Sequence, residues 1–246
     1  MILYFSATGN SHDVANRIAE ALKTQAVSIL DANQETLADV HGVVCPTYAW
    51  GLPYIMEDFL VTHSVSKHEG GIFFIATYGT TPGQIAFWAD RALRKGSGLS
   101  FDVFYSVKMP DTWTPIFDLS DKQKVQAKLD KAQMQVEDII SRLRQGTRGN
   151  HMKGSLPAVT RLIHHPYYDH MRKTSNFHVE QACVGCGLCA RRCPAQVIRM
   201  RDKRPVWTAE RCVMCLSCLH HCPKFAIQYG NKTKAHGQYT NPNMKS

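Results

Sequence analysis

Eight of the nine cysteines stand in two copies of one spacing. The copies are CVGCGLCARRCP at 183–194 and CVMCLSCLHHCP at 212–223, and each reads C-x2-C-x2-C-x3-C-P. Three thiolates at such short steps can hold three irons of a cubane cluster from one tight loop, while the fourth cysteine points away. Pro194 and Pro223 keep the following turn from closing over that fourth ligand. The pattern therefore favours [4Fe-4S] chemistry over a pair of zinc sites, which use separated CxxC pairs without a third cysteine.

The repeat resembles the domain of bacterial two-cluster ferredoxins over residues 178–229. By that resemblance the fourth cysteine of each copy serves the cluster of the other copy. One cluster then takes Cys183, Cys186, Cys189 and Cys222, and the other takes Cys193, Cys212, Cys215 and Cys218. Such clusters pass single electrons, so electron flow is expected, with a second redox group in the remainder of the chain.

Hydroxyl and amide side chains gather in YFSATGNS, residues 4–11, at the end of an apolar run. Between a strand and a helix, backbone N–H groups and the helix dipole favour an anion, and the hydroxyls add donors. The segment has neither the glycine spacing of a dinucleotide fingerprint nor the lysine of a nucleoside triphosphate loop. It predicts a cradle for a terminal phosphate, although a plain helix cap is the simpler alternative. The predicted donors are Ser6, Thr8, Gly9, Asn10 and Ser11.

Two further loops carry aromatic residues and glycines after apolar runs, PTYAWG at 46–51 and TYGTTPG at 77–83. Because ligands of open α/β sheets bind beside the carboxyl ends of the strands, both loops are expected at the same site as the cradle. Their rings and glycines suit a flat ring system. The predicted contacts are Pro46, Thr47, Tyr48, Ala49, Trp50, Gly51, Thr77, Tyr78, Gly79 and Gly83.

These loops need a scaffold, and residues 1–146 supply the pattern for one. Five apolar runs rich in branched and aromatic residues predict strands: MILYFS, AVSIL, GVVCP, GIFFIAT and FDVFYSV. Segments with helical spacing of apolar residues, such as 11–23 and 124–144, lie between or after them. The alternation predicts an α/β domain with a doubly wound, five-stranded parallel sheet.

Composition divides the rest of the chain into three parts. Residues 147–177 lose the alternation and are expected to form a linker with one short helix at 156–165. Residues 178–230 are expected to form a small α+β domain around the two clusters. The polar tail, 231–246, is expected to be disordered because it offers little apolar surface to bury.

With a hydroxyl-rich loop after its first strand, the N-terminal domain resembles flavodoxin over residues 1 to about 145. That resemblance implies FMN as the ligand, bound at the switch point of the sheet. The whole chain resembles the flavodoxin–ferredoxin fusion family of bacteria and archaea, including YFSATGNS and CPTYAWGLP. This resemblance implies an electron-transfer flavoprotein of the cytoplasm. No charged leader and no run of about eighteen apolar residues is visible, so neither export nor a membrane span is expected.

The balance of 29 Lys and Arg against 20 Asp and Glu gives a net charge of +9, although typical flavodoxins and ferredoxins are acidic. Basic residues are dense in and near the cysteine-rich part, which predicts an acidic redox partner. They are Arg161, Arg172, Lys173, Arg191, Arg192, Arg199, Arg201, Lys203 and Arg204. A nucleic-acid module that uses its cysteines as a zinc scaffold would explain the charge but not the flavin loops, so no nucleic acid is expected.

Two functions stay open on the sequence alone. The first is an electron carrier in which FMN and two [4Fe-4S] clusters exchange electrons with partner proteins. The second is an FMN-dependent reductase of a quinone or disulfide, with a pocket formed by Tyr48, Trp50, Tyr78 and Trp113. No acid or base pair stands out, so no catalytic residue is assigned, and the choice between enzyme and carrier stays open. Cys45 is expected to be a buried hydrophobe.

Overall fold

The N-terminal part of the chain is built on a parallel sheet of six strands in the order β2-β1-β3-β4-β5-β6. The computed structural model describes residues 1–244. Five strands overlap the five predicted runs, which confirms the parallel α/β sheet: β1 Ile2–Tyr4, β2 Ala26–Ser28, β3 Gly42–Pro46, β4 Phe73–Tyr78 and β5 Val103–Lys108. The sixth, β6 Gly149–Asn150, pairs with β5 and comes from the segment expected as a linker.

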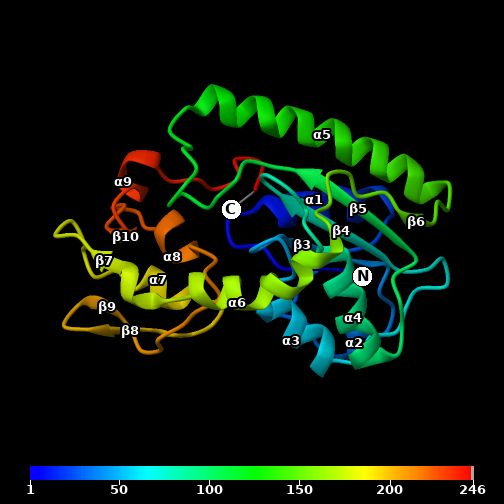
Figure 1. Ribbon diagram of the computed structural model, residues 1–246, viewed down its shortest axis with the longest axis horizontal. Coiled ribbons are helices and arrows are strands. Elements are labelled where there is room, and N and C mark those ends of the chain that lie inside the picture. The colour runs from blue at the N-terminus through cyan, green and yellow to red at the C-terminus, as the bar shows by residue number, and fades with distance from the viewer. Residues whose placement is uncertain (245–246) are drawn as a thin grey trace.

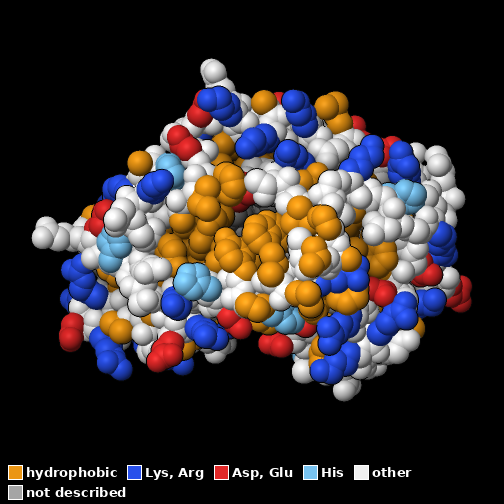
Figure 2. All heavy atoms as spheres, viewed as in Figure 1, with side chains coloured by type: hydrophobic (Ala, Val, Ile, Leu, Met, Phe, Trp, Pro, Cys, Tyr) orange, Lys and Arg blue, Asp and Glu red, His pale blue; other side chains and the backbone are white. Residues whose placement is uncertain are grey.

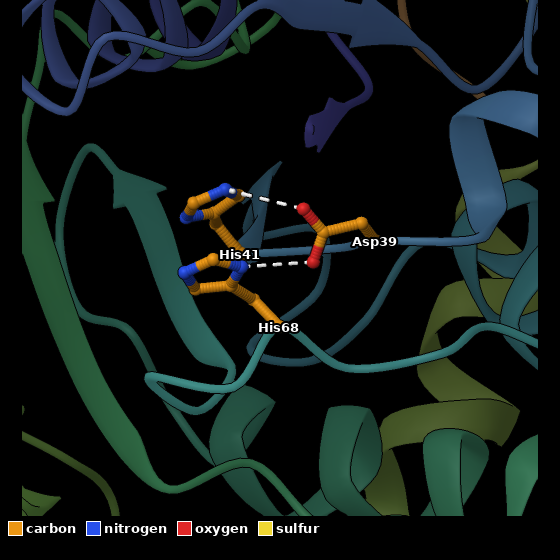
Figure 3. Close-up of side chains that lie close together, drawn as sticks. All are labelled: Asp39, His41 and His68. Carbon is orange, nitrogen blue, oxygen red and sulfur yellow. Dashed lines mark hydrogen bonds and ion pairs between the residues drawn. The ribbon is translucent and has the colours of Figure 1, made fainter.

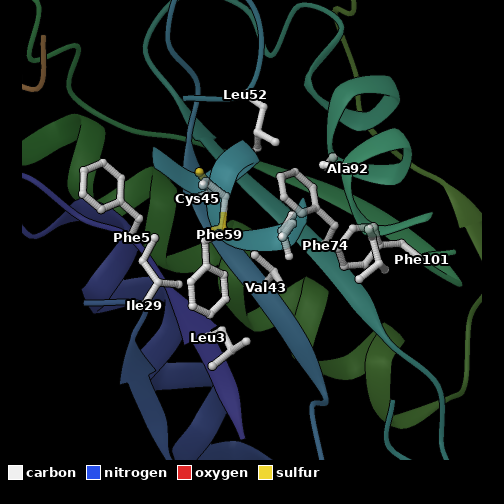
Figure 4. Packing of buried hydrophobic residues seen from close by; sticks show 14 of the residues in the cluster. Leu3, Phe5, Ile29, Val43, Cys45, Leu52, Phe59, Phe74, Ala92 and Phe101 are labelled. Carbon is white, nitrogen blue, oxygen red and sulfur yellow. The ribbon is translucent and has the colours of Figure 1, made fainter. Parts of the chain in front are cut away.

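Helices cover both faces of this sheet (Figure 1). On one face, α1 and α5 bury Val14, Ile18 and Leu129 against the strands. On the other face, α3 and α4 bury Phe59 and Ala92 among the residues drawn in Figure 4. Cys45 lies in that second core and is fully buried, as expected. The helices are α1 Asn10–Ala21, α2 Gln34–Leu37, α3 Tyr54–Thr62, α4 Ile85–Ser97 and α5 Lys122–Arg144.

The segment expected as a linker forms a helix that packs on the α/β domain. It begins with a 3-10 turn, η1 Ala158–Thr160, and continues as α6 Arg161–Met171, so the helix starts and ends later than predicted. Tyr168 stacks on Tyr54 of α3 at 4.9 Å between ring centroids, and His165 stacks on Trp88 of α4 at 4.4 Å. The segment is therefore a structural part of the junction between the domains.

The cysteine-rich part is a small domain with two short antiparallel pairs of strands. β7 Phe177–Val179 pairs with β10 Ile227–Tyr229, and β8 Ile198–Arg201 pairs with β9 Arg204–Trp207. Each cysteine copy supplies one four-residue helix, α7 Leu188–Arg191 or α8 Ser217–His220, so the sequence repeat becomes a structural repeat. The short η2 Thr174–Asn176 leads into β7.

The prediction of a disordered tail is wrong for residues 231–244. They form α9 Thr233–His236 and then a segment that returns to the start of α1. Tyr239 is 4% exposed and Asn241 is 2% exposed. Hydrogen bonds from a tyrosine and an asparagine hold this segment in place. A hydropathy scale does not predict such bonds. The last two residues of the expected tail, 245–246, lie outside the described residues.

None of the helices within residues 1–244 combines the length and the apolar composition needed to cross a bilayer.

Candidate functional site

A cavity of about 380 Å³ opens between the two domains, beside the carboxyl ends of β1, β3, β4 and β5. The middle of the face in Figure 2 is hollowed and lined with apolar side chains. The α/β domain contributes the loops after these four strands, and the cysteine-rich domain contributes Met214, Cys215 and Leu216. A cavity of this volume is within the range of cofactor sites. Its wall is shared by both domains.

Most of the residues predicted to bind the cofactor meet at this cavity. Those in its wall are Ser6, Thr8, Asn10, Ser11, Pro46, Thr47, Tyr48, Ala49, Trp50, Thr77, Tyr78 and Gly79. Three predicted glycines lie behind the wall instead. A side chain at Gly9 would collide with the C-terminal segment, one at Gly51 with the ring of His164, and one at Gly83 with the carbonyl of Trp50. These glycines allow close packing of the loops rather than close approach of a ligand.

Hydroxyl groups connect the first and third loops of the cavity. Ser11 Oγ lies 2.8 Å from Thr77 Oγ1, and the backbone N–H of Gly9 donates to Ser6 Oγ at 3.1 Å. Thr47 Oγ1 is buried and has no hydrogen-bond partner among the described residues. A buried hydroxyl without a partner costs about 1–3 kcal/mol. The donor set is therefore consistent with a polar ligand, such as a flavin phosphate, that completes it.

The aromatic loop after β3 holds an uncommon backbone conformation. Ala49 and Trp50 have φ values of 48° and 65°, in the left-handed region. His164 Nδ1 lies 2.9 Å from the carbonyl oxygen of Ala49, and because a carbonyl only accepts, Nδ1 carries the proton. Burial lowers the pKa of His164, so its ring is neutral at pH 7. The indole of Trp50 stacks on Tyr167 at 4.8 Å, and α6 thus supports this strained wall.

Sequence reasoning missed the loop after β5 as a part of the site. This loop contributes Met109, Pro110, Asp111, Thr112 and Trp113, of which only Trp113 was a candidate. The rule that placed the loops after the third and fourth strands applies equally to the fifth, so this signal was available. By contrast, Tyr167, Tyr168 and Met171 of α6 reach the cavity from a segment without a strand pattern.

Asp111 is the acidic side chain in the cavity wall. Its Oδ1 accepts a hydrogen bond from the backbone N–H of Trp113 at 3.1 Å. A side chain at Gly79 would collide with the carboxyl group, so glycine is needed there. Burial raises the pKa of Asp111, because the charged carboxylate is poorly solvated. The cavity thus contains one group that is more easily protonated than an ordinary aspartate.

The eight repeat cysteines form two groups, each around its own small cavity. Cys183, Cys186, Cys189 and Cys222 line one, and Cys193, Cys212, Cys215 and Cys218 line the other. None of these eight thiols forms a disulfide bond within residues 1–244. The fourth cysteine of each copy joins the group of the other copy, as the resemblance implied. Four convergent thiols suit a cubane cluster, but ligation of iron stays a prediction.

The two groups differ in depth, and we name them by their position relative to the large cavity. The near group contains Cys212 and Cys218, which are 9% and 8% exposed, and Cys215, which also lines the large cavity. The far group contains the exposed Cys186. Burial raises the pKa of Cys212 to about 11 and that of Cys215 to about 12. Bare thiolates are disfavoured there, because the charged form is poorly solvated.

A separate cluster of titratable side chains lies at the opposite edge of the sheet, ahead of β3 and β4 (Figure 3). His68 Nδ1 lies 2.8 Å from Asp39 Oδ1, and His41 Nε2 lies 3.8 Å from Asp39 Oδ2. The two imidazole rings stack at 3.8 Å with an interplanar angle of 19°. Ring nitrogens bind a metal in the plane of the ring, and nearly parallel stacked planes share no point close to both rings. As placed, this cluster is a hydrogen-bonded group rather than a metal centre.

Comparison with protein families gives two matches. Residues 1–135 match the family model of the flavodoxin domain, and residues 176–223 match that of the 4Fe-4S dicluster domain. The second match contains all eight repeat cysteines, and the first contains all four strand-end loops of the cavity. No curated protein matches the chain.

Proposed function

The chain belongs to the flavodoxin family through residues 1–135 and continues into a 4Fe-4S dicluster domain, and from that premise we propose that it couples FMN to two [4Fe-4S] clusters. The two domains give the chain an electron-transfer or redox role. When bound, FMN exchanges one or two electrons, and each cluster exchanges one. The observation that carries the proposal is the position of Cys215, which lies both in the near group and in the wall of the large cavity.

The residues of the cavity divide into two binding roles in this proposal. The hydroxyls and N–H groups of the first loop would hold the phosphate at the start of α1, where the helix dipole favours an anion. Tyr48 and Trp50 would enclose the ring system, since both stand in the wall on the loop supported by α6. Thr47 would gain the partner that its buried hydroxyl lacks.

The two cysteine groups would act in series. The near group adjoins the large cavity and is deeply buried, which shields it from partner proteins. The far group lies beneath an exposed loop whose Val184 is 60% exposed. Electrons would therefore pass between FMN and a partner through the near group and then the far group.

The surface around the far group suits an acidic partner. Arg191 donates from Nη1 to the carbonyl of Cys186 at 3.0 Å, so a cation lies directly beside the exposed ligand loop. Arg199, Arg201 and Lys203 are exposed on the neighbouring hairpin β8–β9. Opposite charge speeds encounter and is screened by salt. Electron transfer with an acidic ferredoxin is expected to slow steeply as ionic strength rises, and a rate independent of salt would contradict this docking surface.

A reductase of a small molecule is the second candidate, and Asp111 favours it. A carboxyl group with a raised pKa beside a redox cofactor can supply a proton to a reduced substrate. The mouth of the cavity includes Ile116, which is 61% exposed, so a substrate has access. Reoxidation of the reduced protein by quinones and by disulfides tests this reading: saturable rates well above those in buffer would support an enzyme.

The content of iron, acid-labile sulfide and flavin after anaerobic purification tests the main proposal. Roughly eight irons, eight sulfides and one FMN per chain are expected. Cys215→Ser is the informative variant, because it should lower iron and sulfide, whereas Cys45→Ser, at a buried core position, should not. Zinc in place of iron and sulfide, with no flavin, would overturn the proposal.

A further inference from the structure

The end of the described chain crosses from the cysteine-rich domain to the first loop of the α/β domain, in red in Figure 1. We call residues 237–244 the C-terminal strap. Tyr239 and Asn241 within it are almost fully buried. Because polar side chains at this depth require hydrogen bonds, the partners of these two residues show what the strap holds together.

On the cysteine-rich side, the strap is fastened beside α8. Gln238 Nε2 donates to the carbonyl oxygens of Leu219 and Cys222, at 2.6 and 2.8 Å. The backbone N–H of Tyr239 donates to His220 Nδ1 at 3.2 Å. The other ring nitrogen of His220 lies 2.9 Å from the carbonyl oxygen of Thr112, in the cavity loop after β5. This end of the strap is therefore fixed to the junction of the two domains.

On the other side, the strap forms the outer wall of the first cavity loop. The hydroxyl of Tyr239 donates to Asn10 Oδ1 at 2.6 Å, and the backbone N–H of Asn241 donates to the carbonyl of Thr8 at 2.8 Å. Gly9, with φ of 98°, lies between these two contacts. A side chain there would begin 2.9 Å from Asn241 Cβ and 2.7 Å from Met244 Cγ. The space that a side chain at Gly9 would occupy is thus filled by the strap.

The strap also fixes the orientation of the Asn10 amide. Asn10 Nδ2 donates to the carbonyl oxygen of Pro110 at 3.2 Å, and because that carbonyl only accepts, the nitrogen must face it. Asn10 Oδ1 accepts from Tyr239 and, at 3.3 Å, from Asn241 Nδ2, which occupies both of its lone pairs. One N–H of Asn10 is left to donate, and Asn10 lines the cavity.

The strap further engages the acidic residue nearest to the loop. Asp13 stands in the first turn of α1, where its charge would repel a bound phosphate. Asn241 Nδ2 donates to Asp13 Oδ2 at 3.3 Å, and Arg17 Nε donates to Oδ1 at 2.9 Å. These donors offset the carboxylate charge on the side of the loop away from the cavity.

We propose that the C-terminal strap is part of the phosphate site: it holds Thr8, Gly9 and Asn10 in the conformation that binds the phosphate group of the flavin. The inference rests on the proposed function, because it takes FMN as the ligand. It adds that Tyr239 and Asn241, at the far end of the sequence, are positioning residues for that ligand. Riboflavin carries the same ring system without a phosphate, so its affinity should not depend on the strap.

The test compares FMN with riboflavin on protein that keeps its clusters but has lost its flavin. The variants are Tyr239→Phe and Asn241→Ala, with Asn231→Ala, an exposed asparagine before α9, as the matched control. Dissociation constants are measured by quenching of flavin fluorescence under anaerobic conditions. Each strap variant is expected to bind FMN about 3- to 10-fold more weakly, the equivalent of one hydrogen bond, with riboflavin affinity and iron content unchanged.

The outcomes separate the inference from the proposed function. Wild-type protein with no affinity for FMN would reject both. If the wild-type protein binds FMN and the strap variants bind it equally well, the role of the strap in the phosphate site is rejected, whereas the proposed function is not. An equal loss of affinity for FMN and for riboflavin would also reject the role of the strap, because general destabilisation of the protein affects both ligands alike.

The thermodynamic linkage between phosphate binding and the stability of the strap gives a second test, which needs no substitution. If the strap stabilises bound phosphate, then bound phosphate stabilises the strap by the same factor. Saturating FMN should therefore slow amide hydrogen exchange in 239–244 more than saturating riboflavin does. Equal exchange in this segment with either ligand would overturn the proposal.

Discussion

The hydroxyl of Tyr168 donates a hydrogen bond to the carbonyl oxygen of Val213, with 2.7 Å between the oxygens. Tyr168 is 1% exposed and stacks on Tyr54 of the α/β domain. Val213 belongs to the second cysteine loop, directly before the residues that reach the large cavity. One side chain of α6 thus connects the scaffold of the cavity to the near cysteine group.

Tyr168→Phe should destabilise this junction while keeping the ring. The buried carbonyl of Val213 would lose its donor, at a cost of about 1–2 kcal/mol in the free energy of unfolding. Tyr167→Phe is the matched control, because the neighbouring side chain is 39% exposed and contacts Trp50 through its ring. Chemical denaturation of the loaded protein measures the difference. Equal stability of the two variants would show that the hydrogen bond has no net effect.

Thr47→Val should separate the stability of the protein from its affinity for flavin. The buried hydroxyl of Thr47 has no partner among the described residues, so its removal should leave the flavin-free protein as stable as before or more stable. If the hydroxyl binds FMN, affinity should fall about tenfold, or about 1.4 kcal/mol. Thermal denaturation and flavin titration check the two halves. Loss of stability without loss of affinity would contradict a ligand-binding role for Thr47.

The fold was predictable because two local patterns agreed with it. The five apolar runs became the five central strands, since buried parallel strands are apolar along their whole length. The membership of the two cysteine groups followed from the resemblance to two-cluster ferredoxins, which implies that the fourth cysteine of each copy joins the other group. The site loops followed from strand order, which places carboxyl ends at one edge.

The missed parts have a common physical cause: they are held by contacts distant in sequence. The turn η1 and α6 present apolar Val159, Leu162 and Ile163 outwards, and the buried face of α6 carries His164 and Tyr168, so the hydropathy of this segment does not indicate a packed helix. The strap is buried through hydrogen bonds to Thr8 and Asn10, more than 200 residues away. The composition of such a segment indicates disorder, because the local sequence gives no information about hydrogen-bond partners that lie far away in the chain.

Asp111→Asn should change the pH dependence of stability. The pKa of Asp111 is raised by burial, so the native state binds the proton more tightly than the unfolded state does. The protonated carboxyl group therefore adds to the free energy of unfolding below the pKa that Asp111 has in the unfolded chain, about 3.9. This contribution is lost as the pH rises through the higher pKa that Asp111 has in the native state. Asparagine keeps the acceptor for the Trp113 N–H without that charge.

The flavin-free Asp111→Asn variant should therefore melt at a higher temperature than wild type at pH 7. The difference should shrink as pH falls and vanish near pH 3 to 4, which scanning calorimetry across pH can follow. Asp118→Asn, at an exposed position of the same loop, should show no such gain at pH 7. A constant offset at all pH values would instead indicate altered packing against Gly79.

Substitutions in the two cysteine groups should have different effects on electron exchange with the flavin. Cys215→Ser alters the group beside the cavity, and Cys186→Ser alters the exposed far group. Each should lose up to about four of roughly eight irons. After illumination has reduced the flavin, electrons should reach the remaining cluster rapidly in Cys186→Ser and much more slowly in Cys215→Ser, because only the near group adjoins the cavity. Cluster absorbance after a light pulse measures this. If Cys186→Ser were the slower variant, or both were equally fast, the order of the two groups would have to be reversed or abandoned.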